Sequence, residues 1–61
     1  MEYININQDF KFISDDMGNI HVYQLIKGQE HYYDTIDNME PLPEDEFRYK
    51  CKCWYSDNVL Y

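Results

Sequence analysis

The most regular stretch of the chain reads Phe47-Arg48-Tyr49-Lys50-Cys51-Lys52-Cys53-Trp54-Tyr55, and its residue types alternate. Side chains of a β-strand point to opposite faces with a period of two. One face would carry aromatic residues and cysteines, namely Phe47, Tyr49, Cys51, Cys53 and Tyr55. The other face would carry three basic residues and the tryptophan, namely Arg48, Lys50, Lys52 and Trp54. This alternation predicts the central strand of a small sheet.

Several shorter runs upstream also favour strands. Residues 3–6 and 10–13 are rich in aromatic and β-branched residues, and they form either one bulged strand or two separate strands. The segment Asp15-Asp16-Met17-Gly18-Asn19 is typical of a turn, because glycine adopts positive φ easily and Asp and Asn side chains bond the nearby backbone. A strand over residues 20–26 follows. These segments together predict a β-hairpin.

The segment after Lys27-Gly28 is ambiguous. Lys27-Gly28 marks either a turn or the approach to a helix. Residues 29–39 fit a short helix, but their weak helix formers favour a strand. Two prolines predict a loop over residues 37–46 that leads into the central strand. Near the end, residues 56–58 are typical of a turn and residues 59–61 of a short final strand.

Length and composition support a single small β domain over residues 1–61. The chain has seven Tyr, three Phe and no Ala, a composition that favours strands over helices. A chain of this size buries only about 60% of its unfolded surface, so a homodimer or a tightly bound partner would stabilise it. The predicted fold is mainly β, an antiparallel meander of three to five strands. In the α+β alternative, one short helix at residues 29–39 accompanies this sheet.

Charge is distributed unevenly along the chain. Residues 1–46 contain eleven acidic residues and two lysines (net −9), whereas residues 47–61 contain three basic residues and Asp57 (net +2), which gives −7 in all. Such a surface repels nucleic acid and anionic membranes, and it attracts basic protein surfaces. The chain has no long apolar stretch and its start lacks the features of a signal peptide, so we expect a cytoplasmic protein.

The strongest candidate for a functional site is the acid-rich segment 34–46. Like charges at this density repel one another, and they are better tolerated where a cationic partner answers them. The residues predicted to stand in for DNA phosphates are Asp34, Asp37, Glu40, Glu44, Asp45 and Glu46, with Asp15 and Asp16 secondary. Tyr32 and Tyr33 are predicted apolar anchors beside them. The alternative is a solvated acidic loop without a partner.

Other chemistries have weaker support in the sequence. Cys51 and Cys53 together with His21 and His31 would supply a zinc ligand set, but a single Cys-x-Cys without a second closely spaced pair is weak evidence for zinc. A chain of 61 residues also has little room for a pocket that excludes water. We therefore expect no enzymatic activity, no cofactor and no metal.

The turn Asp15-Asp16-Met17-Gly18, followed by Lys27-Gly28, resembles the start of small acidic phage-encoded inhibitors that mimic DNA, of the uracil-DNA glycosylase inhibitor type. The resemblance implies a three-stranded antiparallel sheet with a helix, homodimerisation, and acidic and aromatic residues placed in the DNA groove of a repair enzyme. We therefore expect a stoichiometric inhibitor of a basic nucleic-acid-binding host protein, active in the host cytoplasm. The second hypothesis is a structural or adaptor module that assembles through β-edges and aromatic contacts.

Overall fold

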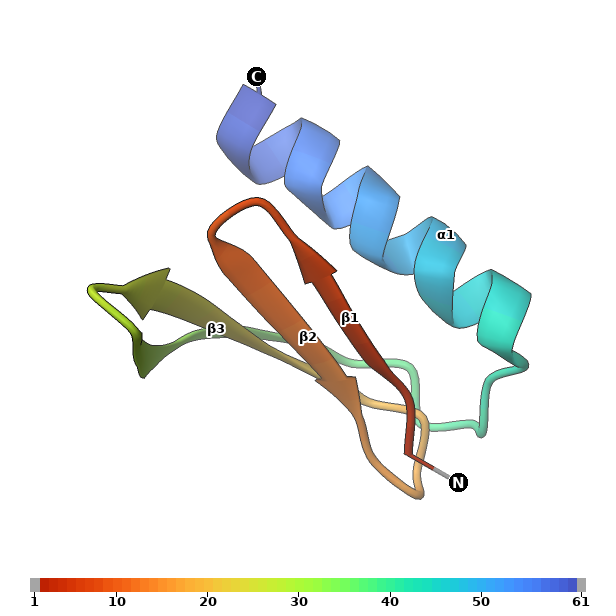
Figure 1. Ribbon diagram of the computed structural model, residues 1–61. Coiled ribbons are helices and arrows are strands. Elements are labelled where there is room, and N and C mark those ends of the chain that lie inside the picture. Colours follow the sequence, from red (N-terminus) through yellow and green to blue (C-terminus); the bar gives the residue numbers. More distant parts are fainter. Residues whose placement is uncertain (1, 61) are drawn as a thin grey trace.

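The computed structural model describes residues 2–60 and shows a four-stranded antiparallel sheet with a helix across one face (Figure 1). The strands follow one another as a meander in the order β1-β2-β3-β4. The elements are β1 (Ile4–Asn7), β2 (Phe10–Ser14), β3 (Ile20–Ile26), β4 (Gln29–Ile36), α1 (Glu44–Tyr55) and η1 (Ser56–Leu60). This arrangement confirms the predicted antiparallel meander and its strand number.

The turns between the strands lie where glycine and polar residues predict them. Residues 3–13 form two separate strands, β1 and β2, joined by a two-residue turn at Gln8. Lys27 and Gly28 both have positive φ, 51° and 80°, as a tight type I′ hairpin turn requires. The turn of residues 15–19 joins β2 to β3, so the predicted hairpin is confirmed.

Strand β4 resolves the ambiguity of residues 29–39. Gln29–Ile36 pairs with β3 along its length, so the strand interpretation is confirmed and the alternative helix at 29–39 is wrong. The pairing shifts by one residue between Val22, which faces Asp34, and Tyr23, which faces Tyr32. Tyr33 is therefore the extra residue of a β-bulge.

The stretch of residues 47–55 is helical, so the prediction of a central strand there is wrong. Phe47, Cys51 and Trp54 are its buried residues, and they are spaced i, i+4 and i+7, which places them on one face of helix α1. The alternation therefore coincides with a helical apolar stripe. The helix continues into a π-helix, Ser56–Leu60, so the predicted turn at 56–58 and final strand are also wrong over the described residues. Tyr61 lies outside them.

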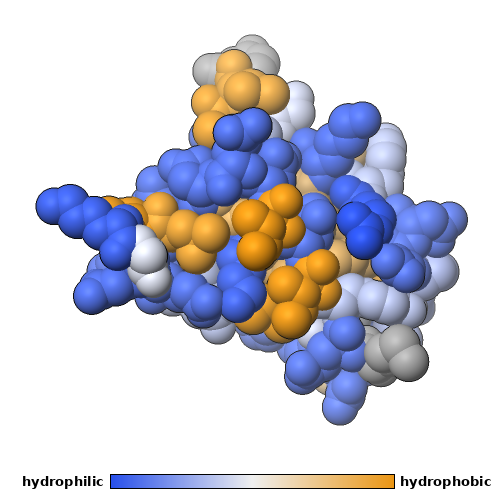
Figure 2. Space-filling view, viewed as in Figure 1, coloured by the Kyte–Doolittle hydropathy of each residue, from blue (hydrophilic) through white to orange (hydrophobic). Residues whose placement is uncertain are grey.

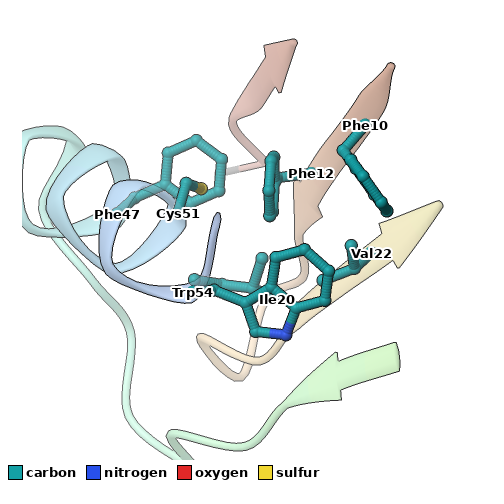
Figure 3. Packing of buried hydrophobic residues seen from close by; sticks show 7 residues of the cluster. All are labelled: Phe10, Phe12, Ile20, Val22, Phe47, Cys51 and Trp54. Atoms are coloured by element: carbon teal, nitrogen blue, oxygen red, sulfur yellow. The ribbon is translucent and has the colours of Figure 1, made fainter. Parts of the chain in front are cut away.

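The core lies between α1 and one face of the sheet (Figure 3). It consists of Phe10, Phe12, Ile20, Val22, Phe47, Cys51 and Trp54. The Trp54 ring packs edge to face against two phenylalanine rings, with centroids 5.3 Å from Phe10 and 5.6 Å from Phe12. Such aromatic pairs stabilise the core by about 0.5–1.5 kcal/mol each beyond the area they bury. The helix thus supplies apolar area that the small sheet lacks.

The other face of the sheet has no helix over it, and we call it the open face. Its apolar residues include Ile4 and Ile6 of β1, 58% and 61% exposed, and Tyr32 of β4, 63% exposed. Figure 2 shows hydrophobic side chains gathered over β1. Lys11 and Glu30 form an ion pair of 2.8 Å between β2 and β4. A solvated sheet face usually carries polar residues, so this face is unusually apolar.

Candidate functional site

Most of the predicted acidic residues meet at one end of the molecule, which we call the acidic end. Three segments form it: the β2–β3 turn, the β4–α1 loop and the first turn of α1. All three lie toward the chain's N-terminus in Figure 1. The carboxylates of the acidic end are Asp15, Asp16, Asp37, Glu40, Glu44, Asp45 and Glu46. The fold thus brings Asp15 and Asp16 of the β2–β3 turn close to the acid-rich segment, although strands β3 and β4 separate them in the sequence.

Asp15 organises the β2–β3 turn. Its Oδ1 accepts hydrogen bonds from the backbone N–H of Met17 at 2.9 Å and of Asn19 at 3.0 Å. Its Oδ2 lies 2.9 Å from Nε2 of His21. The hydrogen bond with His21, together with those from the two backbone N–H groups, lowers the pKa of the Asp15 carboxyl below its ordinary value. Asp15 is therefore ionised and held in place at neutral pH.

The β2–β3 turn is tied to the β4–α1 loop by Asn19 and Gly18. The Asn19 Oδ1 accepts hydrogen bonds from the backbone N–H of Asn38 at 2.9 Å and of Met39 at 3.1 Å. Gly18 has a φ of 85°, and a Cβ added there would lie 1.7 Å from the backbone oxygen of Glu40. The two loops therefore touch, backbone to backbone, at a position that only glycine fits.

The first turn of α1 carries Glu44, Asp45 and Glu46 directly after Pro43. Negative side chains at a helix N-terminus are stabilised by the helix dipole, so this placement also favours the helix itself. Glu44 pairs with Arg48 at 3.1 Å, one helical turn later. Within residues 2–60, Asp45 and Glu46 make no ion pair. Two carboxylates at the helix start thus have no basic side chain paired with them within residues 2–60.

The remaining predicted site residues lie away from the acidic end. Asp34 lies in β4, on the face toward the helix, where its Oδ2 accepts a hydrogen bond of 2.9 Å from Nε1 of Trp54. Because of the bulge, Tyr33 turns toward the helix and packs against Trp54, with ring centroids 5.6 Å apart. Tyr32 points to the open face, where it packs against Tyr23. The two tyrosines therefore lie on opposite faces of the sheet.

A pocket of about 300 Å³ lies between the end of β4 and the helix. It is lined by Ile36, Tyr49, Lys50, Cys53, Trp54, Asp57 and Asn58. Hydrogen bonding to Cys53 raises the pKa of the Tyr49 hydroxyl. This pocket could not be predicted from a strand over residues 47–55, because a strand places Lys50 and Trp54 on the face opposite Tyr49 and Cys53. In the helix, the spacing of three and four residues brings them together.

The cysteines and histidines do not form a shared site. Cys51 of helix α1 points into the core between helix and sheet, and burial raises the pKa of its thiol to about 11. His21 lies on the opposite face of the sheet and is bonded to Asp15. Among residues 2–60, no group of three or more His, Cys, Asp or Glu side chains is arranged to hold a metal ion.

Comparisons with protein-family models, with curated proteins and with solved structures each returned no match. Within the described part of the chain, no helix has the length and apolar character needed to cross a membrane. Three surface features stand out among residues 2–60, namely the acidic end, the open face, and the pocket beside β4.

Proposed function

We propose that this protein binds, through its acidic end, a basic nucleic-acid-binding surface of another protein and inhibits that protein stoichiometrically. The observation that carries the proposal is the tie between the two acid-bearing loops, made by Asn19 and by the contact between Gly18 and Glu40. It supports a reading in which carboxylates from separate segments are held together as a fixed surface. A surface of this kind replaces the phosphates that a basic groove otherwise binds.

The physical cost of the acidic end supports a binding role. Like charges that are held close together repel one another and destabilise the folded chain. A cationic groove offsets this repulsion when it binds the acidic end. Carboxylates that are already fixed lose little conformational freedom on binding. The host targets of this chemistry are enzymes of DNA repair or of defence, in which Lys and Arg line a DNA channel. Binding of this kind weakens steeply with added salt, because screening reduces the attraction.

Charge reversal within the acidic end tests the proposal. The double variant Glu44→Lys/Asp45→Lys changes the net charge by +4, from −7 to −3. We expect the affinity for a nucleic-acid-binding protein captured from a bacterial lysate to fall by roughly 100-fold or more. Affinity is measured by titration at several salt concentrations, and circular dichroism checks that the variant is folded.

A matched control separates the site from the net charge. The double variant Asp9→Lys/Asp57→Lys makes the same change of +4 at the opposite end of the molecule, at the β1–β2 turn and in η1. We expect it to keep most of the affinity, because long-range charge contributes little beyond about 10 Å at 0.1 M salt. Equal losses in both variants, or binding that salt does not weaken, would contradict the proposal.

The open face favours a second candidate function, a small structural or adaptor module that assembles through β-edges and aromatic contacts. Ile4, Ile6 and Tyr32 expose large apolar surfaces there, and β1 and β4 are both edge strands. This function predicts self-association that survives high salt and is lost in Ile6→Lys. The control is Leu60→Lys, an equal change in charge at a residue that is 71% exposed in η1. Sedimentation of the protein at low and high salt distinguishes the two functions.

A further inference from the structure

We propose that the edge of β4 and the pocket beside it bind an extended basic peptide segment of a partner protein, which adds to the sheet as a fifth strand. Strand β4 is the last strand of the sheet, so one of its edges has no neighbouring strand in residues 2–60. An exposed edge of this kind pairs readily with another chain through backbone hydrogen bonds.

The position of the helix creates the groove. Helix α1 packs over core residues of β2 and β3, and its Trp54 also contacts Tyr33 and Asp34 of β4. The pocket lies beside these contacts, between the end of β4 and the helix, with Ile36 contributed by β4 and Trp54 by α1. In Figure 3 the Trp54 indole nitrogen points away from the core toward β4, where it bonds Asp34. A strand added at this edge would therefore run alongside the pocket.

The pocket selects an apolar side chain. Its volume of about 300 Å³ lies at the lower end of ligand pockets, which is room for one large side chain. Lys50 and Asp57 are both in its lining and carry opposite charges, so the pocket has no net charge of its own. Side chains of an added strand alternate between the two faces of the sheet. Every second residue of the peptide would therefore point toward the helix, and one of these would enter the pocket.

The edge itself selects basic neighbours. Glu30 and Asp34 lie on β4 and Asp37 follows it, and no Lys or Arg occurs between Gly28 and Arg48. Glu30 is already paired with Lys11, and Asp34 accepts the Trp54 hydrogen bond. Asp37 is therefore the carboxylate at this edge without a partner among residues 2–60, and the whole segment lacks a basic residue, which favours Lys or Arg in the peptide. The β-bulge at Tyr33 interrupts regular pairing, so the added strand would pair with residues 34–36, next to the pocket.

The experiment uses a defined probe, the peptide acetyl-Lys-Val-Lys-Phe-Lys-Val-Lys-amide, added to the full chain. Trp54 is the only tryptophan and lines the pocket, so its fluorescence reports binding directly. We expect a saturable change with a Kd on the order of 0.1 mM, because the paired segment is short. The variant Cys53→Leu, which fills the pocket, should weaken binding at least about tenfold. Lys52→Leu, on the exposed side of the helix, should not.

Two forms of the peptide test for strand addition. In one form the amides of the odd-numbered residues are N-methylated, and in the other form those of the even-numbered residues. In an added strand, one of these two sets of N–H groups bonds the edge of β4 and the other set points away from it, so only one of the two peptides should lose binding. Equal binding of both forms, an unchanged affinity in Cys53→Leu, or no binding up to about 1 mM would overturn the proposal. The Glu44→Lys/Asp45→Lys variant should bind the peptide almost as well, which separates this site from the acidic end.

Discussion

The two ends of the molecule join their strands in different ways. At the end opposite the acidic end, β1 meets β2 and β3 meets β4 through two-residue turns, and nothing lies within 4 Å of a Cβ added at Gly28. At the acidic end the connections are longer, and they are bonded to one another through Asn19 and pressed together at Gly18. The end that carries the like charges is thus the one whose backbone is fixed by contacts between loops.

This difference supports the proposed binding role of the acidic end. Short turns suffice to connect antiparallel strands, as the opposite end demonstrates. A solvated loop needs no contacts that hold its carboxylates in register with those of another loop. Prearranged charges bind a cationic groove with a smaller loss of conformational entropy. We therefore treat the rigidity of the acidic end as the structural basis of the proposed binding.

The two glycines give the largest expected effect. In Gly18→Ala the new Cβ would overlap the Glu40 carbonyl at a φ of 85°, so the two loops must separate. We expect the free energy of unfolding to fall by about 2–4 kcal/mol. Gly28 has a similar φ of 80° but open space around it, so Gly28→Ala introduces the backbone strain without a steric overlap. This variant should lower the free energy of unfolding by about 1 kcal/mol. Urea unfolding measures both, and equal losses would show that the loop contact contributes nothing.

Removal of the amide at Asn19 should have an intermediate effect. Asn19→Ala leaves the backbone N–H groups of Asn38 and Met39 without their acceptor. We expect a loss of about 1–2 kcal/mol and faster hydrogen exchange at these two amides. The counterpart at the opposite end is Asn58→Ala, which removes a single bond to the Trp54 carbonyl and should cost about 0.5 kcal/mol. Unchanged exchange at Asn38 and Met39 would show that Asn19 does not fix the loop.

The smallest effect concerns Asp15 and the pH dependence of stability. Its pKa is lowered in the folded protein, so the stabilisation is fully present above the ordinary pKa near 4 and is lost as pH falls through the lower folded value. Asp15→Asn should therefore make unfolding less dependent on pH between about pH 4 and 2. Asp9→Asn is the control, because the Asp9 side chain makes no hydrogen bond with residues 2–60. An identical acid unfolding curve for Asp15→Asn and the wild type would count against the hydrogen bonds that Asp15 accepts from His21 and from the backbone of Met17 and Asn19.

The local features of the fold could be predicted from the sequence. Gly18 and Lys27-Gly28 mark turns through their own backbone preferences, and the runs between them have the composition of strands. The helix was missed because the alternation in residues 47–55 also contains an apolar stripe at i, i+4 and i+7. Acidic residues directly after Pro43 mark a helix start. They are the local signal that could have decided between a strand period of about two residues and a helical period of about 3.6 residues.

The arrangement of the candidate site depended on contacts that a single sequence does not reveal. The acids of segment 37–46 are neighbours in the chain, so their clustering could be predicted. Their approach to Asp15 and Asp16 depends on the contact between Gly18 and Glu40, which are far apart in sequence. The bulge that places Tyr33 on the same face as Asp34, toward the helix, is likewise a property of strand pairing. The pocket beside β4 exists only because residues 49–58 are helical.

Competition with DNA tests the central claim most directly. The purified protein is immobilised, partners are captured from a bacterial lysate at low salt, and the column is washed first with duplex DNA and then with a salt gradient. We predict release of a nucleic-acid-binding protein by duplex DNA at low salt, and no capture of that protein by Glu44→Lys/Asp45→Lys. Capture that is indifferent to both DNA and salt, or equal capture by the charge-reversed variant, would contradict the account.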